Sequence, residues 1–228
     1  MKKIGMLGGM SWESSLEYYR LMNEMVKEAL GGTHSANCLM YSFDFQVIED
    51  LQHKGEWGKL TDLMVDEAMN LKNAGAECLV ICTNTMHKMA ADIEAATMLP
   101  IVHIAEVTGN EILKHKLEKV LLLGTKFTMA GSFYKEKLQA KGIDVIVPDD
   151  QDQQLVHDII YNELILGINR LESKEVYMGI IKKYGGMGAQ GVVLGCTEIP
   201  LLIQQEDVEM RIFDTTLIHA KAAVEFAL

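Results

Sequence analysis

Two stretches, "GAECLVICTNT" at residues 75–85 and "GAQGVVLGCTE" at residues 188–198, repeat the same order of features 113 residues apart. Each has Gly-Ala, an apolar run of strand length and then small polar residues. A second pair, "KIGMLGGM" at 3–10 and "KVLLLGTK" at 119–126, lies 116 residues apart. Chance similarity between buried strands is the alternative. Two pairs in the same order at nearly equal spacing favour a duplicated unit of about 110 residues, a usual size for a small domain.

Short apolar runs alternate with helical patterns along the whole chain. The expected strands are 2–7, 37–45, 78–82, 100–104, 119–124, 143–147, 191–196 and 211–214. The expected helices are 11–30, 56–75, 87–96, 106–114, 131–140, a stretch over 152–183 broken near Gly167, and a last one from 217. In helix 11–30, Leu16, Tyr19 and Leu21 follow the 3.6-residue spacing of a buried face. Alternating elements of this kind predict βαβ units and parallel sheets.

The predicted fold class is therefore α/β. We expect two similar α/β domains with mainly parallel sheets, related by a pseudo-twofold axis, with a cleft between them. The first domain is predicted to contain residues 1–100 plus 212–228 and the second residues 101–211.

Composition and charge exclude several classes of protein. The chain has 228 residues, 49% of them hydrophobic, with a net charge of −11, which argues against nucleic acid and anionic membrane surfaces as partners. No apolar run approaches the roughly 18 residues of a membrane span, and the N-terminus lacks a signal-peptide pattern, so we expect a cytoplasmic protein. Four cysteines without a CxxC pair and seven histidines without HExxH spacing predict no metal site.

The four turns "GGMSW", "CTNT", "GTKFT" and "GCTEI" follow predicted strands. Ligands in open α/β sheets bind beyond the carboxyl ends of strands, so these turns are expected to face one cleft. Cys196 begins the last turn, where free N–H groups of a short helix are expected to lower the pKa of its thiol. The alternative is a buried structural cysteine.

Two opposed side chains on related strand ends suit a reaction that removes a proton from one face of a carbon and returns it to the other. Such a reaction needs a base and donors for the charge that develops. The expected donors, which would contact the substrate, are the side chains of Asn84, Thr85, Thr125 and Thr197 and backbone N–H groups near Met10.

At these residues the chain resembles the aspartate/glutamate racemases. The resemblance rests on "VICTNTMH" (80–87), "VVLGCTEIPLL" (192–202) and "IGMLGGMSWES" (4–14), and it covers essentially the whole chain. It implies two similar α/β domains and an acidic amino acid as substrate. It also implies a two-base mechanism without pyridoxal phosphate or any other cofactor, with one thiol on each side of Cα, and usually a homodimer.

The chain departs from this pattern at the first thiol. The residue before Asn84 is Thr83, and Cys82 stands one position earlier. The internal repeat aligns Cys82 with Gly195 and Thr83 with Cys196, and side chains alternate along a strand. We therefore assign the first base position to Thr83, with Cys82 as the alternative. A hydroxyl cannot be held as an anion as a thiol can, so Cys196 is expected to be the thiolate base, with one direction of racemisation faster.

Other roles are assigned more loosely. Gln52 is favoured over His53, Lys54 and Lys126 for the side-chain carboxylate of the substrate. Glu198 is expected to orient or deprotonate Cys196, or else to be a carboxylate at a helix N-terminus.

Rival functions on a similar scaffold are maleate isomerase, decarboxylase and hydantoin racemase. A non-catalytic ligand-binding relative is a further alternative. It is distinguished by the lack of deuterium exchange at Cα.

Overall fold

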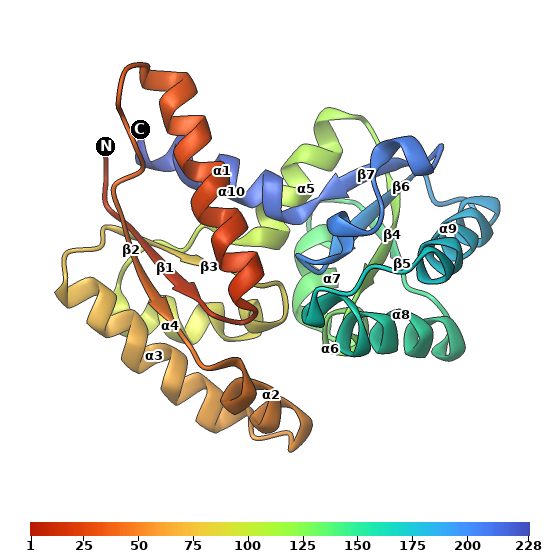
Figure 1. Ribbon diagram of the computed structural model, residues 1–228, viewed down its shortest axis with the longest axis horizontal. Helices are drawn as coiled ribbons and strands as arrows, with labels where there is room; N and C mark the ends of the chain where they lie inside the picture. The colour runs from red at the N-terminus through yellow and green to blue at the C-terminus, as the bar shows by residue number, and fades with distance from the viewer. The chain divides into compact units, whose positions relative to one another are not determined.

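The computed structural model describes residues 1–228, and the chain forms two compact units (Figure 1). The first contains Met1–Ile104 and His219–Leu228, and the second contains Ala105–Ile218. The first unit keeps residues 101–104 because Ile101 forms a parallel bridge with Leu79. The second unit continues past residue 211, where the sequence predicted its end, because strand β7 (Arg211–Asp214) pairs with a strand of that unit.

The first unit has a three-stranded parallel sheet in the order β2-β1-β3. Its elements are β1 (Ile4–Gly8), α1 (Trp12–Leu30), β2 (Cys38–Ser42), α2 (Phe45–His53), α3 (Trp57–Asn73), β3 (Cys78–Ile81), the 3-10 helix η1 (Thr85–Met89) and α4 (Ala90–Thr97). The C-terminal helix α10 (Thr215–Ala227) ends in this unit. In the ladder, Leu7 pairs with Tyr41 on one side and with Ile81 on the other.

The core of the first unit forms where α3 and α4 pack on the sheet. Leu7, Leu79 and Ile81 of the strands are fully buried with Met64 of α3 and Ile93 of α4. Truncating a fully buried side chain of this size to alanine costs about 2–5 kcal/mol, so this layer is a main source of stability for the unit.

Helix α1 buries only part of the face that its apolar spacing predicted, since Leu21 is buried as expected. Ser14 and Ser15 are buried, whereas Leu16 is 56% exposed and Tyr19 is 48% exposed. The reason is the close approach of α1 to β1, since a Cβ at Gly8 would lie 2.7 Å from Oγ of Ser15. Only small side chains fit at that point, so Leu16 and Tyr19 lie on the outer face, whereas Leu21 further along α1 is buried.

Helix α2 was not predicted from the sequence, where the expected strand ran to residue 45 and the next expected helix began at residue 56. The strand ends at Ser42, and Asp44 caps the new helix by accepting a hydrogen bond from the backbone N–H of Gln46 at 3.1 Å. An aspartate at this position is a strong helix-start signal.

The second unit has a four-stranded parallel sheet in the order β5-β4-β6-β7. Its other elements are α5 (Ile104–Lys114), β4 (Lys119–Gly124), α6 (Lys126–Ala130), α7 (Ser132–Gln139), β5 (Asp144–Ile146), α8 (Asp150–Asn162), η2 (Leu164–Leu166), α9 (Leu171–Gly186), β6 (Gly191–Gly195), η3 (Ile199–Leu201) and η4 (Gln205–Asp207). The predicted break near Gly167 is confirmed, since this glycine has a φ of 71° and follows η2.

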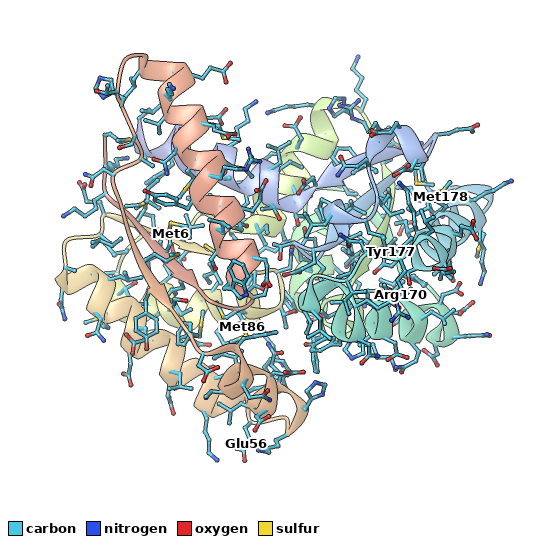
Figure 2. All side chains as sticks on the ribbon, viewed as in Figure 1. Met6, Glu56, Met86, Arg170, Tyr177 and Met178 are labelled. Atoms are coloured by element: carbon cyan, nitrogen blue, oxygen red, sulfur yellow. The ribbon has the colours of Figure 1, made fainter.

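The core of the second unit brings α8 and α9 onto β4 and β6. Leu121 and Leu194 of the strands pack with Val156 of α8 and Tyr177 of α9, which Figure 2 labels. Cys196 belongs to the same buried cluster. The strand end that carries this thiol is therefore fixed by the core of its unit.

The two sheets have corresponding topologies. The central strands are β1 and β4, flanked on one side by β2 and β5 and on the other by β3 and β6. The bridge between Leu79 and Ile101 occupies the place that the β6-β7 ladder holds in the second sheet. The predicted fold class, α/β with parallel sheets, is confirmed. None of the helices combines the length and apolar character that crossing a bilayer requires.

Candidate active site

In the second unit, β4 and β6 end side by side, with Gly124 opposite Gly195 in the ladder. Thr125 and Cys196 are the next residues, so neighbouring strands deliver them to the same edge of the sheet. A Cβ at Gly195 would lie 2.9 Å from the carbonyl oxygen of Leu123, so the strands approach here only because the residue is glycine.

The thiol of Cys196 is held by a carboxylate. Its Sγ–H donates to Oε2 of Glu198 over 2.9 Å, and the hydroxyl of Thr197 donates to the same oxygen over 2.9 Å. Cys196 is 8% exposed, and Glu198 is also buried. The carboxylate of Glu198 therefore lies where it can accept the proton of the Cys196 thiol.

The prediction that the pKa of Cys196 is lowered is wrong. Burial, together with the negative charge of Glu198 and the hydrogen bond to it, raises the pKa of the thiol well above its usual value. The turn that follows, η3, has three residues, too few for a substantial helix dipole. In this arrangement the thiol keeps its proton, and Glu198 is the group placed to take it.

The other predicted substrate contacts of this unit have partners within it. Thr125 caps α6, and its Oγ1 accepts from the backbone N–H of Thr128 at 3.3 Å. The hydroxyl proton of Thr197 points to Glu198, so Thr197 offers lone pairs instead of the donor that was expected. The side chain of Lys126 donates to Gln154.

In the first unit, β3 ends at Ile81, and the chain turns through Cys82 and Thr83 into η1. Cys82 is 1% exposed, and burial raises the pKa of its thiol. Its backbone N–H still extends the ladder by donating to the carbonyl of Leu7 at 2.9 Å. Thr83 is half-buried. The two neighbours therefore differ in access to solvent, with the thiol inside and the hydroxyl nearer the surface.

The remaining predicted residues after β1 and β3 are also buried, namely Met10, Asn84 and Thr85. The backbone N–H of Gly9, next to Met10, donates to Oγ of Ser15 at 2.7 Å, so this donor is used inside the unit. Gly9 has a φ of 80°, and a Cβ there would lie 2.3 Å from the carbonyl oxygen of Phe43. The turn after β1 consequently requires glycine at this position.

Gln52 lies on α2 and contacts η1, the 3-10 helix that follows the end of β3. Its amide donates to Sδ of Met86 over 3.3 Å, and Met86, labelled in Figure 2, belongs to η1. His53 and Lys54 instead lie at the surface, beside Glu49 and Asp50. Burial and the contact with η1 distinguish Gln52 from both of these alternatives.

Two further residues at this strand end, Ser14 and His87, bind the main chain beside Thr83. The hydroxyl of Ser14 donates to the carbonyl of Cys82 over 2.9 Å, and Nδ1 of His87 lies 2.8 Å from the carbonyl oxygen of Thr83. Neither His87 nor Ser14 was singled out as a site residue from the sequence. The spacing of four residues between Thr83 and His87 was the available signal, since it spans about one helical turn.

Residues 7–223 match the family model described as Asp/Glu/hydantoin racemase. The chain belongs to this family. It is thus an amino-acid racemase, an isomerase.

Individual relatives agree with this assignment. The structure of a putative Asp/Glu racemase from Yersinia pestis is 51% identical to this racemase, with a TM-score of 0.93 and coverage of 100% of this chain and 99% of that one. An aspartate racemase homologue from Pyrococcus horikoshii OT3 is 38% identical, with a TM-score of 0.86 and coverage of 100% and 99%. A broad specificity amino-acid racemase from Bacillus subtilis (strain 168) is 24% identical over 97% of this chain and 96% of its own length.

Proposed function

We propose that this racemase acts on an acidic amino acid, aspartate or glutamate or both, without a cofactor. Cys196 is the thiolate base on one face of Cα, and Thr83 stands on the other. The observation that carries the proposal is the contact of 2.9 Å between the Cys196 thiol and Glu198. It supplies the thiol with a proton acceptor in a buried setting.

The steps balance as follows. The proton of Cys196 passes to the carboxylate of Glu198, which leaves a thiolate. The thiolate takes the proton from Cα, and the electron pair of the C–H bond is delocalised into the substrate carboxylate. The hydroxyl of Thr83 then gives its proton to the opposite face, and the proton held on Glu198 returns to Thr83 through solvent.

Thr83 is preferred to Cys82 because Thr83 is more accessible to solvent. Cys82 is 1% exposed and belongs to the buried core, whereas Thr83 is half-buried. A hydroxyl at this position donates a proton readily but is a poor base, because its pKa lies far above that of a thiol. The reaction that starts with Cys196 is therefore faster than the reaction that starts at Thr83.

Substrate contacts are assigned to the polar residues at the strand ends. Asn84, Thr85 and Thr125 are proposed to bind the α-carboxylate, and Gln52 is proposed to bind the side-chain carboxylate. Their burial supports these roles, since hydrogen bonds made by buried groups lose less to competition with water.

The test is deuterium incorporation from D2O into L- and D-aspartate and L- and D-glutamate. The wild type is expected to place deuterium at Cα, with unequal kcat/KM for the two enantiomers. Cys196→Ala is expected to lose the incorporation. If the wild type gives none with any of the four substrates, the chain acts as a binder and the proposal fails.

We infer that the protein is a homodimer and that α1 contributes to its interface. Trp12, Leu16 and Tyr19 are 65%, 56% and 48% exposed and form one apolar stripe on that helix. Ion pairs of Arg20 with Glu17 and Glu24 border the stripe. An apolar centre with a charged rim is the usual anatomy of a protein interface, and a second copy of the chain is the proposed occupant.

Replacing Leu16 with glutamate is expected to convert the dimer to a monomer, because it places a charge in the apolar centre. Sedimentation equilibrium at micromolar concentration measures the change, with circular dichroism as the check on folding. A wild-type chain that sediments as a monomer, or a variant that remains dimeric, contradicts the inference.

A further inference from the structure

The main chain on both sides of Thr83 is held by buried side chains. Ser14 donates to the carbonyl of Cys82 over 2.9 Å, and His87 lies 2.8 Å from the carbonyl oxygen of Thr83. The backbone N–H of Thr83 bonds to the carbonyl of Ile81 at 2.8 Å. The two peptide groups that meet at Cα of Thr83 are thus each fixed by a side chain from outside β3.

The hydrogen bonds of His87 define its protonation. The backbone N–H of Ile104 donates to Nε2 over 3.2 Å, so Nε2 carries no proton. The proton of the neutral ring is therefore on Nδ1, which donates it to the carbonyl of Thr83. Burial, reinforced by the nearby His103 and His219, lowers the pKa of His87 well below its usual value, so the ring stays in this neutral form.

Cys196 lacks an equivalent arrangement. The carbonyl of Cys196 accepts from the backbone N–H of Ile199 at 3.2 Å, which is an ordinary turn bond, and its side chain is held by Glu198. The hydroxyl oxygen of threonine is attached directly to Cβ, and the β-branched side chain has few χ1 rotamers. The backbone therefore largely determines where Oγ1 lies. Fixing both flanking peptides is therefore the direct way to aim the hydroxyl of Thr83.

We propose that His87 and Ser14 are positioning residues for Thr83, and that they aim its hydroxyl at the substrate for proton delivery to the face opposite Cys196. This inference rests on the proposed function, because it assigns Thr83 the second proton transfer. A displacement of about 1 Å in such a donor can reduce the rate of proton transfer by about 100-fold. The bonds from His87 and Ser14 therefore matter for the inversion and not for the first proton abstraction by Cys196.

The test measures two products of one reaction in D2O. Abstraction and return on the Cys196 face gives deuterated substrate of retained configuration, whereas delivery by Thr83 gives the opposite enantiomer. The ratio of retained to inverted deuterated product reports on Thr83 and is unaffected by a general loss of stability. Chiral chromatography with mass spectrometry gives this ratio.

Two substitutions at one position separate the contacts of His87. In His87→Asn the amide nitrogen lies near the place of Nδ1 and keeps the bond to Thr83. In His87→Gln the amide lies near the place of Nε2 and keeps only the contact with Ile104. We expect His87→Gln to raise the ratio about 10-fold and His87→Asn to stay within about twofold of the wild type.

Thr97→Val is the matched control, because Thr97 is a fully buried residue of the same unit whose hydroxyl donates to a main-chain carbonyl elsewhere, that of Ile93, over 2.7 Å. It is expected to leave the ratio unchanged. Ser14→Ala, a milder change, is expected to raise the ratio about threefold and serves if a histidine variant does not fold.

Equal ratios in His87→Gln and His87→Asn, or a rise in Thr97→Val as large as that in His87→Gln, overturn the inference. An unchanged ratio of retained to inverted product in Ser14→Ala also overturns the inference. A wild type that incorporates no deuterium is a different result, because it contradicts the proposed function itself.

Discussion

The ends of β3 and β6 occupy corresponding places in two sheets of related topology, yet they are stabilised by different means. At the end of β6, the side chain of Cys196 bonds to Glu198, and its main chain makes an ordinary turn. At the end of β3, side chains bond to the main chain around Thr83, through Ser14 and His87. In the proposed function, the first arrangement governs the charge of Cys196 and the second governs the position of Thr83.

This difference follows from the chemistry of the two groups. A thiol has to lose its proton to become a base, so its surroundings must include an acceptor. A hydroxyl that donates a proton keeps it until the reaction and needs only the right direction. In the proposed function, the two related strand ends therefore serve unequal halves of one reaction.

The largest expected effect separates the two thiols. Cys196→Ser is expected to lower kcat/KM at least about 1000-fold, because a serine hydroxyl cannot form the required anion. Cys82→Ser is expected to leave kcat/KM within about threefold and to lower the free energy of unfolding by about 1–3 kcal/mol, since it buries a hydroxyl in a core position. Kinetics and urea unfolding of both variants check this, and a loss of activity in Cys82→Ser would return the base role to Cys82.

The next effect tests Glu198. Glu198→Gln is expected to lower kcat about 10- to 100-fold, since the amide cannot accept the thiol proton. It is also expected to lower the pKa of Cys196, because the carboxylate charge that raises this pKa is removed. Iodoacetamide should therefore alkylate the variant faster than the wild type at pH 8. If alkylation slows while kcat falls, Glu198 only supports the fold.

A smaller effect is expected from making the two strand ends alike. Thr83→Cys supplies a second thiol, so the slower direction is expected to gain about 10-fold in kcat/KM relative to the faster one. Initial rates from each enantiomer, measured by polarimetry, give the ratio. An unchanged ratio would show that position 83 does not limit the slower direction, and Thr83→Ser is the control that keeps a hydroxyl.

The smallest effect concerns stability and belongs to the first unit. Burial lowers the pKa of His219 to about 4. Below its ordinary pKa of about 6.5 the unfolded chain binds a proton that the folded chain does not, so stability is full above pH 6.5 and falls as the pH drops towards 4.

Between pH 7 and pH 5 this histidine is expected to remove about 2 kcal/mol from the free energy of unfolding. Urea unfolding of wild type and His219→Gln at both pH values measures it, and the variant is expected to show the smaller change. The exposed His53→Gln should follow the wild type. A variant as sensitive to pH as the wild type would assign the effect to other groups.

The fold was largely predictable because burial leaves a periodic pattern. The strands of both sheets coincided with apolar runs, and the repeat at residues 75–85 and 188–198 identified β3 and β6 as counterparts. Helix α2 was missed because "FDF" at residues 43–45, which leads into it, continues the strand pattern, and only the cap formed by Asp44 marks the start of the helix.

The sequence singles out candidate residues for the site, but it does not reveal their electrostatics. Spacing alone places Cys196 and Glu198 two positions apart, but it does not say that both are buried with the thiol proton directed at the carboxylate. That burial reverses the expected direction of the pKa shift. Likewise, the bond from Ser14 to the carbonyl of Cys82 joins residues 68 positions apart, which no local pattern reveals.

Because its outer edge is held only by the bridge between Leu79 and Ile101, β3 is expected to open locally more easily than β6. β6 is paired along both edges, whereas the outer edge of β3 is held only at Leu79, by bonds with Pro100 and Val102. Strands with few cross-strand bonds open at lower free energy, so amide protons on either side of Leu79 should exchange with solvent well before those of β6. In the proposed function, the hydroxyl that must be aimed thus lies at the end of the strand expected to open more easily, and side chains from α1 and η1 bond to the main chain there.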